Sequence, residues 1–250
     1  GWRVFATARK LADLERLQSE AGVEAIHLEL ADPQSIASCA DRVLEATGGK
    51  LDALFNNAAY SQFGAVEDLP ADRLRHQIEV NLIGTHDLTC RFVPAMRAAG
   101  SGRIVQCSSV LGFVSAPYRG AYCASKFALE ALTDALRWEL AETGIHVSLI
   151  EPGPIATNFV ANLLANFRKT IDYNNSPHRE AYQARMEKME LGGQRTFKLP
   201  PEKVAQKLLH AVASPRPMRR YYVTTPTYAV AAMKRVLPSA IFDGVLRRAM

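Results

Sequence analysis

Short runs of β-branched and aromatic residues alternate with longer amphipathic stretches from the start of the chain to about residue 155. Continuous apolar strands between helices indicate a parallel sheet that is covered by helices on both faces. The pattern predicts strands at Arg3–Ala8, Ala25–Leu30, Ala53–Asn56, Arg103–Cys107, His146–Ile150 and Tyr221–Thr225, and helices at Leu11–Glu20, Pro33–Thr47, Asp72–Ala98, Ala121–Glu142 and Pro201–Ala213. Because no repeat or low-complexity linker interrupts the 250 residues, we expect residues 1–250 to form one doubly wound α/β domain.

The composition narrows the class of protein further. The formal charge is +5 at pH 7, but the basic residues are scattered, so a pocket for an anionic cofactor is a better expectation than nucleic-acid binding. The four cysteines form no CxxC pair, so we expect neither a metal site nor a disulfide framework. Free thiols of this kind predict a reducing compartment. No run reaches about 18 uninterrupted apolar residues, so no spanning helix is expected and the cytoplasm is the predicted location.

The segment CSSVLGFVSAPYRGAYCASKFALEALTDALRWEL holds the densest set of candidate catalytic residues. Tyr122 and Lys126 are four residues apart in a helical pattern, so their side chains share one face. An ammonium near a phenol favours the phenolate, and we therefore expect Lys126 to lower the pKa of Tyr122 from about 10. Alone, such a pair is more often an ordinary surface contact on a helix.

Polar and small residues end three predicted strands, where a parallel sheet places groups that contact a ligand. Ser109 follows one strand, thirteen residues before Tyr122, and NNAA (Asn56–Ala59) ends another. EPGPIAT (Glu151–Thr157) ends a third with a turn and a threonine hydroxyl. These companions favour a catalytic site over a surface pair.

In order and spacing, these motifs resemble the short-chain dehydrogenase/reductases over nearly the whole chain, and most of all the branch that contains hydroxysteroid and retinol dehydrogenases. The resemblance implies a Rossmann-like fold in which Tyr122 exchanges a proton with the substrate oxygen. It also implies that Lys126 tunes Tyr122 and holds the nicotinamide ribose, and that Ser109 hydrogen-bonds the substrate oxygen. Asn81, in VNLIGT, would anchor a water that links Lys126 to solvent.

The same resemblance implies a surface that binds the cofactor. Ile155 and Thr157 would meet the nicotinamide carboxamide, Glu29 and Leu30 would border the adenine, and Asn57 and Ala58 would line the adenosine ribose. The full set of implied contacts is Arg9, Glu29, Leu30, Asn57, Ala58, Tyr122, Lys126, Pro152, Gly153, Ile155 and Thr157. Ala59 stands where the family usually has glycine, and we expect a slightly tightened turn there.

Arg9 decides the choice of cofactor. In dinucleotide-binding folds an acidic residue after the second strand binds the ribose 2′-hydroxyl, whereas an arginine accommodates a 2′-phosphate. The first strand of this chain, Arg3–Ala8, corresponds to the second strand of that fold. Arg9 and Lys10 follow it and no carboxylate occurs before Asp13, which favours NADP(H) over NAD(H). The plain alternative is a solvated arginine at a strand end.

Beyond Thr157 the alternation stops. Residues 158–199 mix aromatic and methionine side chains with charges, and in the family this region covers the substrate, so a hydrophobic small-molecule substrate is expected. Packing against the sheet explains these side chains about equally well. The tail 226–250, which Pro238 divides into two short helices, could cover the substrate, contact a partner subunit or lie on a membrane surface.

Three functions fit these observations. The first is an NADP(H)-dependent oxidoreductase that transfers hydride between nicotinamide and a carbonyl or alcohol. The others are a non-catalytic dinucleotide-binding or scaffold protein, and sugar-nucleotide epimerase chemistry, which usually needs a larger C-terminal domain. By resemblance, Ala121–Glu142 and Asp72–Ala98 would form the interface of a homodimer or homotetramer.

The family begins with a strand and a glycine-rich turn that binds the pyrophosphate, but neither GxGxxG nor TGxxxGxG occurs in this chain. In the strand order 3-2-1-4-5-6 the first strand is central. We therefore expect that roughly 25–30 residues, the first β-α unit, precede this sequence in a longer protein. Two strands would then lack a shared partner in mid-sheet, and the isolated chain could be inactive.

Overall fold

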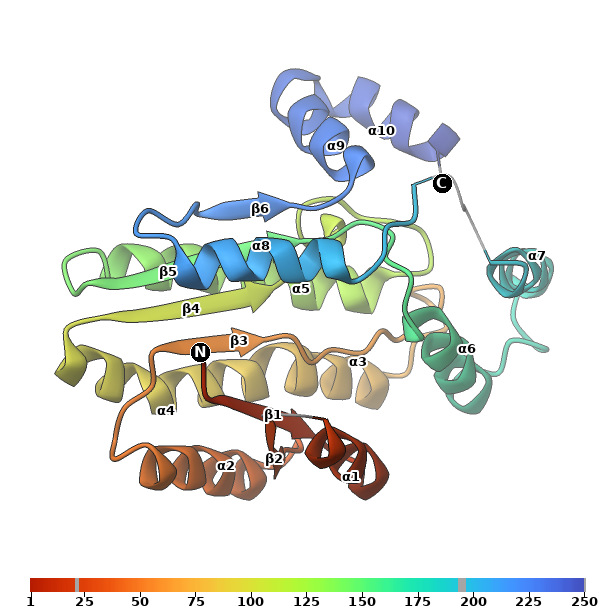
Figure 1. The fold of residues 1–250 in the computed structure, drawn as a ribbon. Coiled ribbons are helices and arrows are strands. Elements are labelled where there is room, and N and C mark those ends of the chain that lie inside the picture. Colours follow the sequence, from red (N-terminus) through yellow and green to blue (C-terminus); the bar gives the residue numbers. More distant parts are fainter. Residues whose placement is uncertain (21–22, 193–196, 250) are drawn as a thin grey trace.

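The computed structural model describes residues 1–20, 23–192 and 197–249, in which strands and helices alternate as the sequence predicts (Figure 1). The strands are β1 Val4–Ala8, β2 Val23–His27, β3 Ala53–Asn56, β4 Gly102–Cys107, β5 Ile145–Glu151 and β6 Arg220–Tyr222. The helices are α1 Leu11–Ser19, α2 Pro33–Ala46, α3 Ala71–Ile78, α4 Gly84–Ala99, α5 Gly120–Glu139, α6 Phe159–Thr170, α7 Arg179–Glu190, α8 Glu202–Ala213, α9 Thr225–Val236 and α10 Ser239–Ala249.

Every pair of neighbouring strands is parallel, which confirms the α/β class and the Rossmann-like sheet. β1 pairs with β2, and the remaining strands follow in the order β3-β4-β5-β6. The two sets divide between β1 and β3, where the sequence predicts two strands without a shared partner. Since β3, β4, β5 and β6 all point the same way, the residues that follow β3, β4 and β5 emerge along one edge.

Helices cover both faces of the four-stranded sheet, as predicted. Ile104 of β4 packs with Met96 of α4 on one face. The next residue, Val105, packs with Ala211 of α8 on the other. All four side chains are almost completely buried, so the middle of β4 lies inside the hydrophobic core.

The predicted helix Asp72–Ala98 is interrupted. A π-helical turn, Glu79–Ile83, separates α3 from α4. Gly84 follows it at a close approach, because a Cβ there would lie 1.9 Å from the Leu30 carbonyl oxygen. An extra residue per turn of this kind re-aims a side chain, here that of Asn81, and such turns are frequent at functional sites.

Two strands end earlier than predicted. The strand expected at Tyr221–Thr225 ends at Tyr222, because Thr225 begins α9 with Pro226 in the first turn, where proline is favoured. The strand expected at Ala25–Leu30 ends at His27, since the Glu29 backbone N–H donates to Ser35 Oγ at 2.9 Å instead of to a neighbouring strand.

The segment 158–199 contains α6 and α7, except that residues 193–196 lie outside the described part. Its largest aromatic side chains are core residues: Phe167 and Tyr182 are fully buried, and both rings contact Phe63 at centroid distances of 5.0 and 5.9 Å. These two residues are therefore packed in a core, but that core is formed with the loop after β3 and with α6 and α7, and not against the sheet. Phe159, at the start of α6, instead faces Tyr122.

The tail forms α9 and α10, divided at Pro238 as predicted, with Met250 outside the described part. Figure 1 shows both helices beyond the β6 side of the sheet. Across residues 1–20, 23–192 and 197–249, no helix has the length and apolar character that crossing a membrane requires.

Candidate active site

Tyr122 and Lys126 lie in the first two turns of α5, and both side chains are buried. The Lys126 Nζ atom is 5.8 Å from the centroid of the Tyr122 ring and donates a 2.7 Å hydrogen bond to the Cys107 carbonyl oxygen at the end of β4. The Tyr122 ring meets Phe159 edge to face, 5.7 Å between centroids. The helix thus presents a phenol and an ammonium to the edge where the strands end.

Ser109 comes to the same place from the loop after β4. Its Oγ accepts the Leu111 backbone N–H at 3.1 Å and so caps the 3-10 turn Val110–Gly112. It also hydrogen-bonds the Tyr122 side chain. The structure therefore brings together three of the four side chains that the sequence selects as a catalytic group.

The expected lowering of the pKa of Tyr122 is wrong for this structure. Burial of the phenol raises its pKa well above the usual range, and the hydrogen bond from Ser109 and the charge of Arg119 offset this only in part. Burial likewise lowers the pKa of Lys126. The physical reason is that the ammonium is directed at the Cys107 carbonyl and lies beside the ring, in a site where desolvation dominates.

Asn81 lies in the π-helical turn, 1% exposed, with its amide fully engaged. Its Oδ1 accepts the Tyr60 N–H at 3.1 Å, and its Nδ2 donates to the Tyr60 carbonyl at 2.9 Å and to Ser125 Oγ at 3.2 Å. Asn81 thereby fastens the loop after β3 to α5, one residue before Lys126. None of the hydrogen bonds found in the described residues joins Asn81 to Lys126 directly.

The residues expected to bind the cofactor follow β3 and β5 along the same edge. Asn57 and Ala58 are exposed after β3. After β5, the Pro152 carbonyl accepts the Val110 N–H at 2.9 Å, which ties this turn to the loop of Ser109. A Cβ on Gly153 would lie 2.1 Å from Thr224 Oγ1, so the turn requires glycine.

The last two residues of that turn differ in their surroundings. Ile155 is half-buried and bridges to Leu199 in parallel fashion. Thr157 is exposed, and its Oγ1 accepts the Phe159 N–H at 3.3 Å. Both therefore lie between β5 and α6, next to the helix that brings Phe159 to Tyr122.

Arg9, Glu29 and Leu30 form a separate group beyond β1 and β2. The Arg9 side chain is 61% exposed, and its Nε lies 3.5 Å from Glu29 Oε2. Leu30 is 7% exposed and packs in the core around Ile36 and Phe92. The Arg9 and Glu29 side chains are accessible to solvent, whereas the Leu30 side chain is committed to the core.

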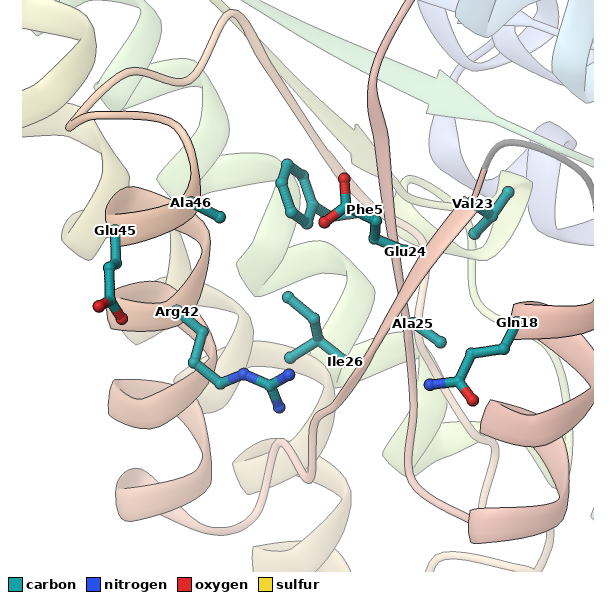
Figure 2. Close-up of a pocket in the computed structure, with 9 residues that line it drawn as sticks. All are labelled: Phe5, Gln18, Val23, Glu24, Ala25, Ile26, Arg42, Glu45 and Ala46. Carbon is teal, nitrogen blue, oxygen red and sulfur yellow. The ribbon is translucent and has the colours of Figure 1, made fainter.

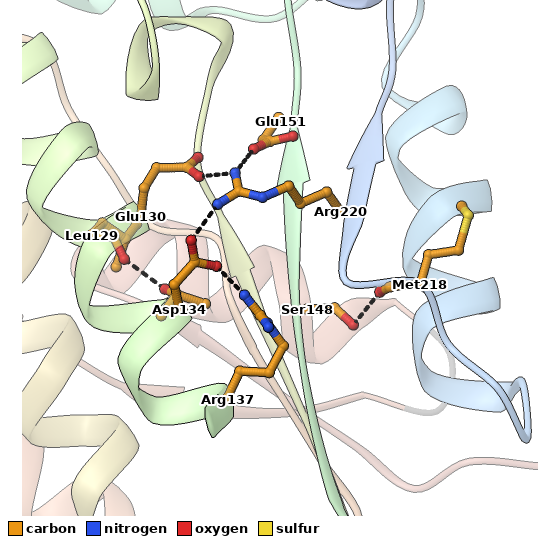
Figure 3. Close-up of polar contacts among 9 residues, drawn as sticks. Leu129, Glu130, Asp134, Arg137, Ser148, Glu151, Met218 and Arg220 are labelled. Atoms are coloured by element: carbon orange, nitrogen blue, oxygen red, sulfur yellow. Dashed lines mark hydrogen bonds and ion pairs between the residues drawn. The ribbon is translucent and has the colours of Figure 1, made fainter. Parts of the chain in front are cut away.

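Sequence reasoning missed a cluster of charges that begins one helical turn after Lys126 on α5 (Figure 3). Arg220 of β6 pairs with Glu130 and Asp134 of α5 and with Glu151 of β5. The four-residue spacing of Lys126, Glu130 and Asp134 along one helix face was a usable signal. Nothing local in the sequence marks Arg220 as their partner.

Two surface pockets lie outside this catalytic group. One, about 430 Å³, is open between α1, α2 and the β1-β2 pair, with Arg42 and Glu45 on one side and Gln18 on the other (Figure 2). The second, about 490 Å³, is lined by Ala65, Val66, Glu67, Pro117, Tyr118 and His178. This pocket lies between the 158–199 segment and the loop before α5, where Tyr118 Oη lies 3.2 Å from His178 Nδ1.

With this geometry in place, comparison with known proteins gives the class. Residues 1–169 match the family described as short chain dehydrogenase, and the chain belongs to that family. Its members and structural neighbours are oxidoreductases, and the chain is an enzyme that acts on CH–OH or C=O groups.

Particular relatives extend over nearly the whole chain. It is 41% identical to the uncharacterized oxidoreductase YbbO of Escherichia coli (strain K12), over 99% of this chain and 86% of that protein. It is 34% identical to human 17-beta-hydroxysteroid dehydrogenase type 1, over 95% of this chain and 74% of that protein. A solved structure of a single-residue variant of actinorhodin polyketide ketoreductase with NADPH is similar at a TM-score of 0.72 and 26% identity, covering 88% of this chain and 85% of that one.

Proposed function

We propose that this enzyme is an NADP(H)-dependent carbonyl reductase or alcohol dehydrogenase in which Tyr122 transfers the proton. The observation that carries the proposal is the meeting of Tyr122, Ser109 and Lys126 at the carboxyl edge of the sheet. The cofactor supplies or accepts the hydride when bound. This chain's own residues bind, orient and exchange the proton.

The residues at the edge suit a dinucleotide. Asn57, Ala58 and Thr157 are exposed there, and Gly153 lets the backbone turn without a side chain. The Lys126 ammonium has three donors, one of which goes to the Cys107 carbonyl, so others can reach ribose hydroxyls. We propose that these residues hold the nicotinamide half, as the family resemblance implies.

In the reductive direction the proton comes from Tyr122. As hydride reaches the carbonyl carbon, the Tyr122 O–H bond breaks and its proton passes to the substrate oxygen, so that an alcohol forms. Ser109 Oγ donates a hydrogen bond to the same oxygen and fixes its place beside the phenol. The high pKa of the buried phenol keeps it protonated, which is the form that reduction requires.

Tyr122→Phe tests the assignment of the proton donor. We expect kcat for NADPH-dependent carbonyl reduction to fall about 10²- to 10⁴-fold, the usual contribution of a general acid, while NADPH binding followed by fluorescence is retained. Tyr228→Phe is the matched control, because Tyr228 is an exposed residue of α9. A Tyr122→Phe enzyme with wild-type turnover would remove Tyr122 from the mechanism, and wild-type protein that binds NADPH but reduces nothing would indicate a non-catalytic binding protein.

For the cofactor, we propose NADP(H), with the exposed Arg9 guanidinium on the 2′-phosphate. Its neighbour Glu29 orients the guanidinium through an ion pair that leaves further N–H donors available. The NADPH in the similar ketoreductase structure supports this choice. Arg9→Ala is expected to lower kcat/KM for NADPH about tenfold or more and to leave that for NADH unchanged, as loss of a charged hydrogen bond predicts. Arg16→Ala, equally exposed and paired with Glu20, is the control; an equal loss for NADH would contradict the assignment.

For the substrate, we propose a hydrophobic carbonyl or alcohol compound. Phe159 presents its ring to Tyr122, and the 34% identical relative is named for hydroxysteroids. A panel of steroid, retinoid and alkyl carbonyl compounds, each run with NADPH, measures the preference. A preference for small charged carbonyl compounds would contradict the proposal.

We further propose a cytoplasmic homodimer or homotetramer built on α4 and α5. Phe127, Leu132 and Trp138 of α5 are exposed apolar residues, and all four cysteines are free thiols. Light scattering is expected to show an oligomer that Trp138→Glu weakens, and a wild-type monomer would contradict it.

A further inference from the structure

One guanidinium, that of Arg220, ties α5, β5 and β6 together (Figure 3). Arg220 Nη1 donates to Glu130 Oε2 and to Glu151 Oε1, and Arg220 Nη2 donates to Asp134 Oδ2 at 2.7 Å. Glu130 is one helical turn after Lys126 on α5, while Glu151 is the last residue of β5. The cluster therefore fixes the α5 face that carries Lys126 to the strand that leads into the Gly153 turn.

The cluster is buried most deeply on the side of the catalytic group. The side chains of Glu151 and Glu130 are 0% and 8% exposed, whereas that of Asp134 is 29% exposed. Asp134 also pairs with Arg137, so its charge has a second partner toward the outside. Among the ion pairs of the described residues, Arg220 is the only partner of Glu130 and the only partner of Glu151.

The second oxygen of Glu130 faces the loop of Ser109. A Cβ built on Gly112 would lie 2.9 Å from Glu130 Oε1 and 2.4 Å from Ser108 Oγ. Glu130 Oε1 is buried and has no hydrogen-bond partner among the described residues. A buried carboxylate oxygen left in this way is costly unless a positive charge compensates it.

Arg220 pairs with the other oxygen of Glu130, and Lys126, one helical turn before Glu130 on α5, is a second buried cation near this carboxyl. Lys126 is 2% exposed, and burial lowers its pKa, whereas the Cys107 thiol and then the Glu130 carboxylate act in the opposite direction. The titratable groups that act on Lys126 are Glu130 and the Cys107 thiol, and Tyr122 lies on the same helix face. Glu130 is therefore the carboxylate that opposes the desolvation of Lys126.

The neighbouring carboxyl of the cluster, Glu151, has a raised pKa. Burial and the neighbouring Glu130 raise the pKa of Glu151 to about 8, against the opposing effect of Arg220. Tyr222, in β6, is the further titratable group that faces both carboxyls.

We propose that Glu130 is a positioning residue that keeps the Lys126 ammonium charged and directed at the catalytic group, and that Arg220 and Glu151 hold Glu130 in place. The role of Lys126 in the reaction rests on the proposed function. The state of its ammonium does not, and can be measured separately.

Glu130→Gln tests the proposal because it removes the charge and keeps the shape. In protein labelled with ¹³Cε-lysine, and with the Lys126 signal assigned by its loss in Lys126→Met, we expect the pKa of Lys126 to fall by about one unit. In enzyme assays of carbonyl reduction, the alkaline limb of the kcat profile is expected to move to lower pH by the same amount. Asp134→Asn, which also removes a carboxylate from Arg220, is expected to change neither readout.

An unchanged Lys126 titration in Glu130→Gln overturns the proposal, as does an equal shift in Asp134→Asn. If Glu130→Gln does not fold, Glu130→Asp, which withdraws the charge by one methylene, is expected to give a smaller shift in the same direction, and no shift overturns it. A shifted titration in a wild-type protein without reductase activity would retain the electrostatic role of Glu130 and reject the proposed function.

Discussion

Gly153 has room for a hydrogen atom and nothing larger. A Cβ there would lie 2.1 Å from Thr224 Oγ1 and 2.8 Å from Thr227 Oγ1, and these hydroxyls bond each other at 2.9 Å at the start of α9. The glycine therefore lets the turn after β5 pack directly on the first turn of the tail. At this position the requirement is steric contact with a distant segment.

Gly153→Ala is expected to destabilise the fold by about 1–3 kcal/mol, the usual cost of overpacking, because the turn and α9 must separate. Urea unfolding monitored by circular dichroism measures the change. Gly244→Ala, the same substitution in α10, has nothing within 4 Å and is expected to be neutral or slightly stabilising. Equal effects of the two substitutions would show that Gly153 is not sterically constrained.

At the scale of elements, local pattern predicted much and tertiary contacts decided the rest. Alternating apolar runs predicted the order of strands and helices, because burial from both faces leaves a local signature. The π-helical turn at Glu79–Ile83 leaves none, since it depends on the contacts of Asn81 with Tyr60 and Ser125. The end of β6 likewise depends on where α9 begins.

The same division applies to the candidate site. The spacing of Tyr122 and Lys126 predicted a shared helix face, which follows from helical geometry alone. The raised pKa of Tyr122 could not be predicted, because it results from burial under segments such as α6. The partnership of Arg220 with Glu130 could not be predicted either, since 90 positions separate them in the chain.

One phenol of helix α7 is hydrogen-bonded to the loop after β3. Tyr182 is fully buried, and its Oη accepts the Ala65 N–H at 2.7 Å and donates to Asp68 Oδ2 at 2.6 Å. Tyr182→Phe leaves a buried N–H and a carboxylate without this partner, so we expect a loss of about 1–3 kcal/mol and faster proteolysis within α7. Limited proteolysis followed by mass spectrometry locates the cleavage.

Tyr173→Phe is the matched control for this prediction. Tyr173 stacks on Phe167 at 5.4 Å and is only half-buried, and no hydrogen bond of its hydroxyl occurs among the described residues. The control is expected to be cleaved at the wild-type rate. If Tyr182→Phe is no more susceptible than Tyr173→Phe, packing alone holds α7 in place.

At the scale of the whole molecule, Glu151 links stability to pH because its cluster joins α5, β5 and β6. The ordinary pKa of a glutamate is 4.5, and burial with the neighbouring Glu130 raises that of Glu151 to about 8 in the folded protein. Between these values the folded protein binds a proton that the unfolded chain does not. Stability contributed by this group is therefore complete below pH 4.5 and is lost as the pH rises through about 8.

Glu151→Gln keeps the neutral form of this side chain at every pH, and its amide oxygen can still accept from Arg220. Between pH 5 and 8 we expect the unfolding free energy of the variant to fall less steeply than that of the wild type, by up to about 1.4 kcal/mol per pH unit. Urea unfolding at each pH measures the slope. Glu24→Gln is the control, because the hydrogen bond from Arg3 lowers the pKa of the exposed Glu24. The stability that Glu24 contributes is present above pH 4.5 and is lost as the pH falls below that value, so this substitution should not alter the decline between pH 5 and 8. If the unfolding free energy of Glu151→Gln still declines between pH 5 and 8, the titrating proton lies on another residue of the cluster. If this decline disappears in Glu24→Gln, the titrating proton lies outside the cluster.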